Sequence, residues 1–212
     1  MFPEWLDRLR PAVLIAVVGL PTYVLGMMYY AGSPRTWRVG YSPEQPVAFS
    51  HAVHAGQLGL DCRYCHTTVE EAATAALPPT SICMNCHERI AATSDKLALV
   101  RDSYASGKPI PWVRVHDLPD FVYFDHSAHV RRGVSCVVCH GRVDQMEQVT
   151  QVEPLSMAWC LDCHRNPDKH LRPPELVTDL GWVPDDDPLA IGQQVRTQLD
   201  INPSTDCSTC HR

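Results

Sequence analysis

The sequence Cys-x-x-Cys-His occurs five times in this chain of 212 residues, and these five motifs contain all ten of its cysteines. The spacing is typical of c-type haem attachment, in which both thiols bond to the porphyrin and the histidine binds the iron. A chain with five such sites must fold around five large planar groups. The motifs are Cys62–His66, Cys83–His87, Cys136–His140, Cys160–His164 and Cys207–His211.

Each motif is therefore predicted to hold one haem c, so that the chain binds five haems with their iron. Thioether bonds are predicted at both cysteines of every motif, and the motif histidine is predicted to be the proximal iron ligand. The cysteines are Cys62, Cys65, Cys83, Cys86, Cys136, Cys139, Cys160, Cys163, Cys207 and Cys210, and the proximal ligands are His66, His87, His140, His164 and His211.

Paired cysteines also occur in zinc sites, disulfide frameworks and redox dithiols. A zinc site does not require a histidine directly after every cysteine pair. A disulfide framework would scatter its cysteines rather than place all of them at one spacing. A redox dithiol would occur once, beside a βαβ pattern that is not visible in this sequence. Zinc binding stays open as the main alternative to haem.

The distal ligands decide what kind of haem protein this is. Of the eleven histidines, five belong to motifs and six do not. An iron with two protein ligands has no open position for a substrate, and such a haem carries electrons. Distal ligands are predicted at His51, His54, His116, His126 and His129.

Three further residues are candidates for distal ligation. His170 follows the fourth motif, and Met146 and Met157 lie between the third and fourth motifs. A surface histidine is often only a solvated polar residue, and a methionine is more often part of the packing. A methionine ligand would give one iron a higher potential than an iron with two histidines.

Part of the chain is an internal repeat. Phe49–His54 and Phe124–His129 both have the pattern Phe-x-His-x-x-His, and each is followed by two haem motifs. Copy one covers residues 46–100 and copy two covers residues 121–172. The repeat predicts one supersecondary unit used twice. Because residues i and i+3 share a helix face, one histidine of each pair can serve its own haem and the other a neighbouring haem.

The linker at residues 101–120 contains His116, which belongs to neither copy. We interpret His116 as the distal ligand of the Cys83–His87 haem. A C-terminal segment, residues 173–212, carries the fifth motif.

The expected fold is mainly α with extensive loop. Beyond the N-terminal region the chain has few long periodic apolar runs and many prolines, which predicts short helices and little or no sheet. So few residues are available for each haem that the porphyrins must form much of the core. The net charge of −6 argues against nucleic acid as a partner.

Residues 11–32 hold no charged residue and are long enough to cross a bilayer as a helix. A cleaved signal peptide is the alternative, but its apolar region is usually shorter and ends at a small-residue cleavage site. An uncleaved single-pass anchor is expected. Covalent haem is attached outside the cytoplasmic membrane in bacteria, so residues 1–10 are expected in the cytoplasm and residues 33–212 on the periplasmic side.

The order of these features resembles the pentahaem cytochrome c subunit of bacterial alternative complex III, over nearly the whole chain. The resemblance is carried by the anchor and by the blocks FSHAVHAG, PPTSICMNCH, VHDLPDFVYFDHSAHVRRGVSCVVCHG, MAWCLDCHRNP and DCSTCHR. The Phe-x-His-x-x-His units also resemble small class III multihaem cytochromes, which have no membrane anchor.

The resemblance to alternative complex III implies a relay role in a respiratory or photosynthetic chain. A polytopic membrane subunit would oxidise quinol, with an iron–sulfur subunit beside the haems. Electrons would pass along five haems to a monohaem cytochrome c or a blue copper protein. Most irons would have two histidine ligands, with room for one His/Met iron. Two other functions stay open: a free-standing membrane-anchored quinol dehydrogenase feeding periplasmic reductases, and a multihaem reductase of nitrogen or sulfur oxyanions.

Overall fold

A computed structural model describes residue 3 and residues 5–211, and the chain divides into two units, Met1–Val39 and Gly40–Arg212. The first unit contains α1 (Trp5–Ala31) and the 3-10 turn η1 (Pro34–Trp37). Helix α1 has 27 residues, so its length is about 40 Å, more than the hydrocarbon thickness of a membrane.

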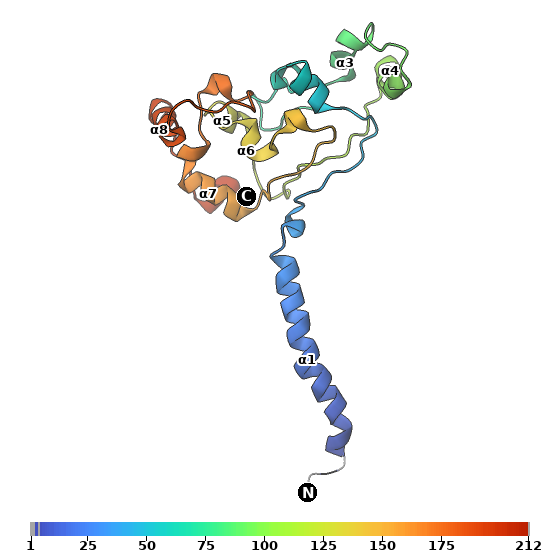
Figure 1. Ribbon diagram of the computed structural model, residues 1–212, viewed down its shortest axis with the longest axis vertical. Coiled ribbons are helices and arrows are strands. Elements are labelled where there is room, and N and C mark those ends of the chain that lie inside the picture. The colour runs from blue at the N-terminus through green and yellow to red at the C-terminus, as the bar shows by residue number, and fades with distance from the viewer. Residues whose placement is uncertain (1–2, 4, 212) are drawn as a thin grey trace. The chain divides into compact units, whose positions relative to one another are not determined.

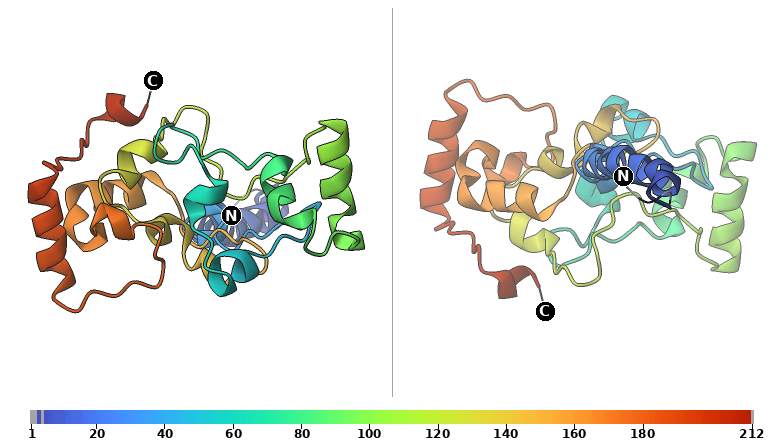
Figure 2. Two further views of the ribbon diagram at one scale, coloured as in Figure 1. Left: turned by 90° about the horizontal axis from the view of Figure 1, so that it is seen from above. Right: turned by 90° about the horizontal axis from the view of Figure 1, so that it is seen from below.

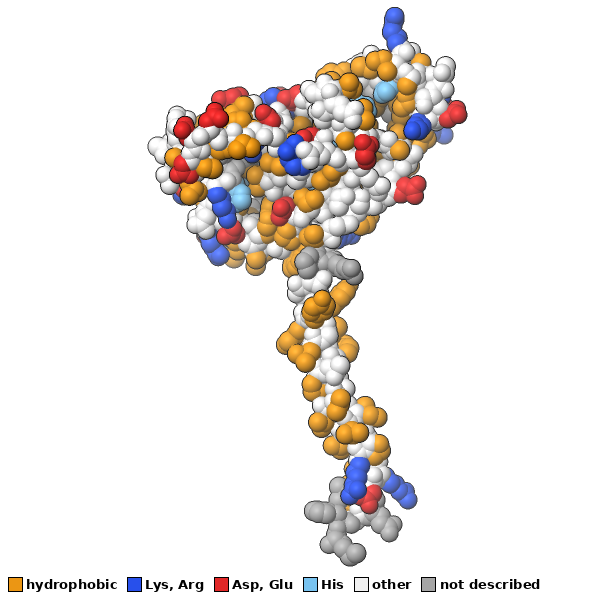
Figure 3. All heavy atoms as spheres, in the orientation of Figure 1, with side chains coloured by type: hydrophobic (Ala, Val, Ile, Leu, Met, Phe, Trp, Pro, Cys, Tyr) orange, Lys and Arg blue, Asp and Glu red, His pale blue; other side chains and the backbone are white. Residues whose placement is uncertain are grey.

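Beyond its charged first turns helix α1 is apolar on all sides, and an 18-residue window within Asp7–Ala31 has a mean hydropathy of 1.9. Figure 3 shows hydrophobic side chains around the helix and charged side chains at its N-terminal end. There Arg10 and Asp7 form an exposed ion pair at 2.8 Å. The two internal prolines do not end the helix. By length and composition α1 can cross a membrane, although a signal sequence would have the same properties.

The second unit consists of short helices joined by loops, as the sequence predicts. Between residues 40 and 211 there is no strand, only isolated bridges that pair Val122 with His211 and Val134 with Leu171. The α-helices are α2 (Cys62–Cys65), α3 (Thr80–His87), α4 (Ala98–Ser106), α5 (His126–Val130), α6 (Cys136–His140), α7 (Met157–Arg165), α8 (Pro188–Gln198) and α9 (Cys207–Cys210). One π-helical turn, η2 (Ala52–Gln57), and the 3-10 turns η3 (Asp95–Leu97), η4 (Val143–Gln145), η5 (Pro167–His170) and η6 (Pro174–Leu176) complete the unit.

Polar N-caps mark the starts of three of the helices that carry a haem motif. The Asp61 side chain accepts a hydrogen bond from the backbone N–H of Arg63 at the start of α2. Ser135 does the same at the start of α6, and Ser156 at the start of α7. Such caps satisfy backbone donors that have no partner within the helix. Each therefore fixes a short helix around its cysteine pair.

The apolar core is divided into three small clusters of buried side chains. The first contains Val47, Met84, Val100 and Ile110, the second contains Val69, Val130 and Val177, and the third contains Leu171, Val195 and Ile201. Such small clusters agree with an interior that is completed by bound groups.

The second haem motif of each copy lies toward a different end of the second unit. In Figure 1 and in both views of Figure 2, α3 and α4 lie at one end, and α7 and α8 lie at the other. The elements α5 and α6 lie between these ends, beside the first copy. The middle of the unit is therefore the place where the two copies meet.

Candidate haem-binding sites

The two cysteines of each motif lie on one helical turn. In α2, α6 and α9 the motif forms most or all of the helix, and in α3 and α7 it forms the C-terminal part. Because residues i and i+3 share a helix face, both thiols of a motif project to the same side. None of the ten cysteines forms a disulfide bond. Among the described residues there is no cluster of three or more His, Cys, Asp or Glu side chains of the kind that holds a metal.

The two copies of the repeat have nearly the same ring geometry. Phe49 lies edge-on to His51, with centroids 4.8 Å apart, and stacks on His54 at 4.4 Å. Phe124 lies edge-on to His126 at 4.8 Å and stacks on His129 at 4.6 Å. The phenylalanine therefore holds both histidine rings of its copy in a fixed relative orientation.

The second histidine of each copy faces the histidine of the second motif in that copy. The centroids of His54 and His87 are 6.1 Å apart, and those of His129 and His164 are also 6.1 Å apart. Two imidazoles on opposite sides of one metal ion, each bonded at about 2 Å, have centroids about 6 Å apart. Both pairs have the separation that one haem iron between them requires.

The first histidine of each copy lies near the first motif of that copy. His126 and His140 are nearly parallel, with centroids 6.4 Å apart, which also suits one shared iron. In copy one, His51 is close enough to His66 for their charges to interact. Each copy thus associates its first histidine with its first motif and its second histidine with its second motif.

Hydrogen bonds orient most of these rings. When the Nδ1–H of a histidine donates to a carbonyl, the tautomer is fixed and Nε2 keeps its lone pair for a metal. The distal candidates His54, His126 and His129 are close to the carbonyl oxygens of Ser50, Ala73 and Asp125, at 2.7–2.9 Å. The motif histidines His66, His87, His164 and His211 are close to those of Ala76, Ile90, Ser204 and Phe121, at 2.6–3.2 Å.

Two buried ring nitrogens have no hydrogen-bond partner, Nδ1 of His51 and Nε2 of His116. A buried polar atom without a partner is costly, and Nε2 of His116 is an atom that a metal could satisfy. The partnerless Nε2 of His116 and the ring separations fit haem iron.

Burial keeps several of these histidines neutral. Burial lowers the pKa of His51 to about 4, with further lowering by the nearby His66 and His54. Burial also lowers the pKa of His140 to about 3, assisted by His116 and His126. The pKa values of His116 and His129 are lowered for the same main reason. Because only neutral imidazole binds a metal, these rings are ready to bind iron at neutral pH.

His116 does not lie where the sequence suggested. It was expected opposite His87, but His54 faces His87, and the His116 ring packs edge-on against His140 at 4.3 Å. The linker is held there because the Gln45 side-chain amide pairs with both backbone groups of Val113, at 2.9 Å each. At 4.3 Å, His116 and His140 are too close together to bind one iron from opposite sides in this arrangement.

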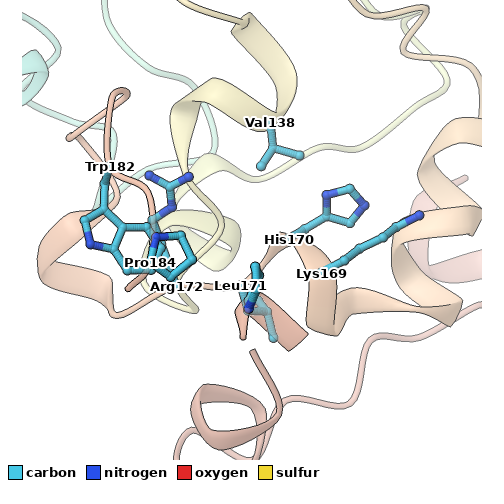
Figure 4. Close-up of a pocket in the computed structure, with 8 residues that line it drawn as sticks. Val138, Lys169, His170, Leu171, Arg172, Trp182 and Pro184 are labelled. Carbon is cyan, nitrogen blue, oxygen red and sulfur yellow. The ribbon is translucent and has the colours of Figure 1, made fainter. Parts of the chain in front are cut away.

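The other three candidate ligands lie outside the histidine pairs. Met157 is largely exposed at the start of α7, and Met146 is half-buried after η4. His170, on η5, lines a cavity of about 110 Å³ with Val138 and Trp182. Figure 4 shows Lys169 and His170 on one side of this cavity, and Arg172 stacked on Trp182, its guanidinium carbon 5.0 Å from the ring centroid.

The carbonyl groups that orient the rings could not be found from the sequence. Ala73, Ala76, Ile90 and Ser204 act through the backbone, and their side chains carry no signal for this role. Only the folded chain brings each carbonyl within reach of its histidine.

A family model described as cytochrome c7 and related cytochrome c matches residues 47–102 and 122–212. The chain belongs to this family of cytochromes c. Membership accounts for the motif turns, because a cytochrome c binds haem covalently through such cysteines. The two matched segments begin one residue after the predicted starts of the two copies.

This cytochrome c7-family chain is also similar to the menaquinone reductase multihaem cytochrome c subunit of Nitratidesulfovibrio vulgaris. The two are 38% identical over 98 residues, which cover 46% of this chain and 46% of that protein. The alignment therefore spans about half the length of either chain.

Proposed function

We propose that this chain is the electron-relay subunit of a quinol-oxidising membrane complex and carries five covalently bound haems c. The observation that carries the proposal is the pairing of distal and motif histidines about 6 Å apart beside the motif turns. An iron held from both sides has no free position for a substrate, so the chain passes electrons without transforming a substrate.

The paired rings suggest the ligands of four irons. These pairs are His51 with His66, His54 with His87, His126 with His140, and His129 with His164. For the fifth iron, His211 is the proximal ligand and its Nδ1 is anchored by the carbonyl of Phe121. Its sixth ligand is to be sought among the remaining candidates, His116, His170, Met146 and Met157.

The bound haems supply reversible one-electron chemistry at the iron, and the protein contributes position and environment. The anchored Nδ1 atoms hold the imidazole rings in place, so that little rearrangement accompanies a change of charge. The buried, uncharged histidines add no positive charge beyond that of the iron.

Helix α1 supports a membrane anchor for this subunit. In the proposed arrangement it crosses the bacterial cytoplasmic membrane once, with its N-terminus in the cytoplasm and the haem-bearing unit on the periplasmic side. Its apolar surface then lies against lipid or against helices of a partner.

The proposed partners follow from the similar protein and from the family resemblance. The similar protein of N. vulgaris is described as a subunit of menaquinone reductase. The resemblance to alternative complex III adds polytopic quinol-binding subunits, an iron–sulfur subunit, and a monohaem cytochrome c or blue copper protein as acceptor. We propose that this chain lies between quinol oxidation and such an acceptor.

The test is to purify the chain in mild detergent with whatever partners remain bound. The intact mass should exceed that of the polypeptide by five haems, and the oxidised protein should give only low-spin signals in electron paramagnetic resonance (EPR). A high-spin signal from an open iron would instead favour a catalytic reductase. The isolated subunit should not oxidise quinol analogues, and if it did so unaided, the free-standing quinol dehydrogenase would replace the relay.

A further inference from the structure

The attachment turns of the first and third motifs lie against each other, although a whole haem motif separates them in the sequence. The sulfur atoms of Cys136 and Cys62 lie within hydrogen-bond reach of each other. These cysteines begin α2 and α6. The two haem edges attached there must therefore be neighbours.

A short segment clamps these two turns together independently of the thiols. The hydroxyl of Ser135, the N-cap of α6, donates to the carbonyl of Val177 at 2.7 Å. The hydroxyl of Thr178, the next residue, donates to the carboxylate of Asp61, the N-cap of α2, at 2.8 Å. Val177 is 1% exposed. Two consecutive residues, the buried Val177 and the half-buried Thr178, thus hold the starts of both attachment turns.

Other contacts between the copies lie on either side of this clamp. The backbone N–H groups of His126 and Ser127 donate to the carbonyls of Ala73 and Ala72, at 3.0 and 3.3 Å. On the other side, the N–H of Ala52 donates to the carbonyl of Met146 at 3.0 Å. The copies are therefore joined through their first-motif regions.

The remaining motifs extend away from this junction. The Asn85 amide in the second motif donates to the hydroxyl of Tyr64 in the first, at 3.1 Å. At the other end, Nδ1 of His164 in the fourth motif is 2.6 Å from the carbonyl oxygen of Ser204, just before the fifth motif. Cysteines of successive motifs also lie close enough for their charges to interact. They link the first motif with the second, the third with the fourth, and the fourth with the fifth, through Cys65 and Cys83, Cys139 and Cys163, and Cys160 and Cys210.

We propose that the haems follow the spatial order second, first, third, fourth, fifth, so that the second and fifth haems form the two ends of the relay. This inference rests on the proposed five-haem relay and deepens it. In each step one electron leaves a reduced iron and enters its oxidised neighbour, and no bond is made or broken. Exchange with partners then takes place at α3 and at the C-terminal segment.

The order can be tested with His51→Met and His54→Met in the full-length chain carrying all its haems. The two changes are matched, because they place the same residue on one turn, beside the first or the second haem. Loss of the histidine raises the potential of that haem, either because methionine becomes the ligand or because the iron becomes high-spin. EPR shows which of the two has happened. The altered haem is then reduced first, and its added charge lowers the midpoint potentials of adjacent haems.

Redox titration followed by visible spectroscopy and EPR measures how many other haems respond. His51→Met should shift two further midpoints, and His54→Met should shift one. The reverse pattern, with two midpoints shifted by His54→Met and one by His51→Met, would mean that the haems follow the sequence order and would overturn the inference alone. Fewer than five haems in the unaltered protein would overturn the proposed function and the order with it.

Discussion

The two copies of the Phe-x-His-x-x-His unit have the same ring geometry but differ in how the first histidine is held. Nδ1 of His126 is 2.9 Å from the carbonyl oxygen of Ala73, which belongs to the other copy. Nδ1 of His51 is buried without a partner. The repeated sequence thus fixes the local shape of each unit, whereas the contacts between the copies make their first histidines chemically different.

The copies also differ in their surroundings. In copy one, α3 packs against α4 around Met84 and Val100, at one end of the unit. In copy two, α6 lies at the junction, where His140 is in contact with His116 and Cys136 with Cys62. A position at the junction is therefore expected to affect the whole unit more than a position at its end.

The largest expected effect comes from removing one attachment site in each copy. Cys136→Ala with Cys139→Ala removes the haem at the junction, and the second unit should then fail to accumulate in the membrane. Cys83→Ala with Cys86→Ala removes a haem at the end, so a folded protein lacking one haem mass should remain. Intact-mass spectrometry and the membrane yield measure both outcomes, and equal yields would contradict this distinction.

A close approach between the copies gives the next largest effect. A Cβ at Gly56 would collide with the carbonyl oxygen of Asp144, so Gly56→Ala should lower the free energy of unfolding by about 3 kcal/mol. Gly59→Ala is the control, because its Cβ meets nothing within 4 Å and only the φ of +65° is unfavourable, costing about 1 kcal/mol. Denaturant titration compares the two variants, and equal losses would exclude the packing explanation.

The different anchoring of His51 and His126 predicts different potentials. A ligand histidine that donates Nδ1–H to a carbonyl is more electron-rich and favours the oxidised iron. For one net hydrogen bond of about 1 kcal/mol, the third-motif haem should titrate about 40 mV below the first-motif haem. EPR-monitored redox titration measures the two midpoints, which His51→Met and His126→Met assign. The opposite order would show that Nδ1 anchoring does not dominate.

His116 and His170 lie outside the haem motifs and the repeated Phe-x-His-x-x-His units. Their replacement by alanine is expected to have different effects on the EPR spectrum. The His116 ring packs edge-on against His140 with its Nε2 buried, so His116→Ala should change a low-spin signal. His170 is half-buried beside an open cavity, so His170→Ala should leave every low-spin signal unchanged. A new high-spin signal in His170→Ala would instead assign His170 to an iron.

The smallest expected effect is on the stability of the fold at low pH, through the hydrogen bonds that Asp61 accepts. Asp61 accepts hydrogen bonds from Arg63 and Thr178, and the bond from Arg63 is the main cause that lowers its pKa to about 2. Because the pKa is lowered in the folded state, the carboxylate stabilises the fold above pH 4, and this contribution is lost as the pH falls toward 2.

Asp61→Asn should therefore narrow the difference in stability between pH 5 and pH 2, measured by denaturant titration at each pH. Asp102→Asn, at an exposed position on α4, is the matched control and should leave that difference unchanged. An equal effect of both changes would mean that the Asp61 clamp does not contribute.

Much of this protein could be predicted before its fold was known. The apolar run at residues 11–32 became α1, and the proline-rich loops and short helices of the second unit appeared with no strand in residues 40–211. The distal pairing was predictable only in part. The repeat indicated that one histidine of each pair can serve its own haem and the other a neighbouring haem. The sequence suggested His116 for the Cys83–His87 haem, whereas the structure places its ring against His140, because the path of residues 101–120 depends on the pairing of Gln45 with Val113.

The sequence alone determined the chemistry, because thioether attachment and axial ligation need particular atoms at fixed spacings along one helical turn. The tertiary structure decided which sites adjoin. Val177 and Thr178 bring together α2 and α6, and Ala73 reaches His126 from the other copy. Val177 and Ala73 act through backbone carbonyls, which every residue type has. The bond from Thr178 to Asp61 joins side chains that are far apart in the chain, so none of these contacts has a signature in the sequence.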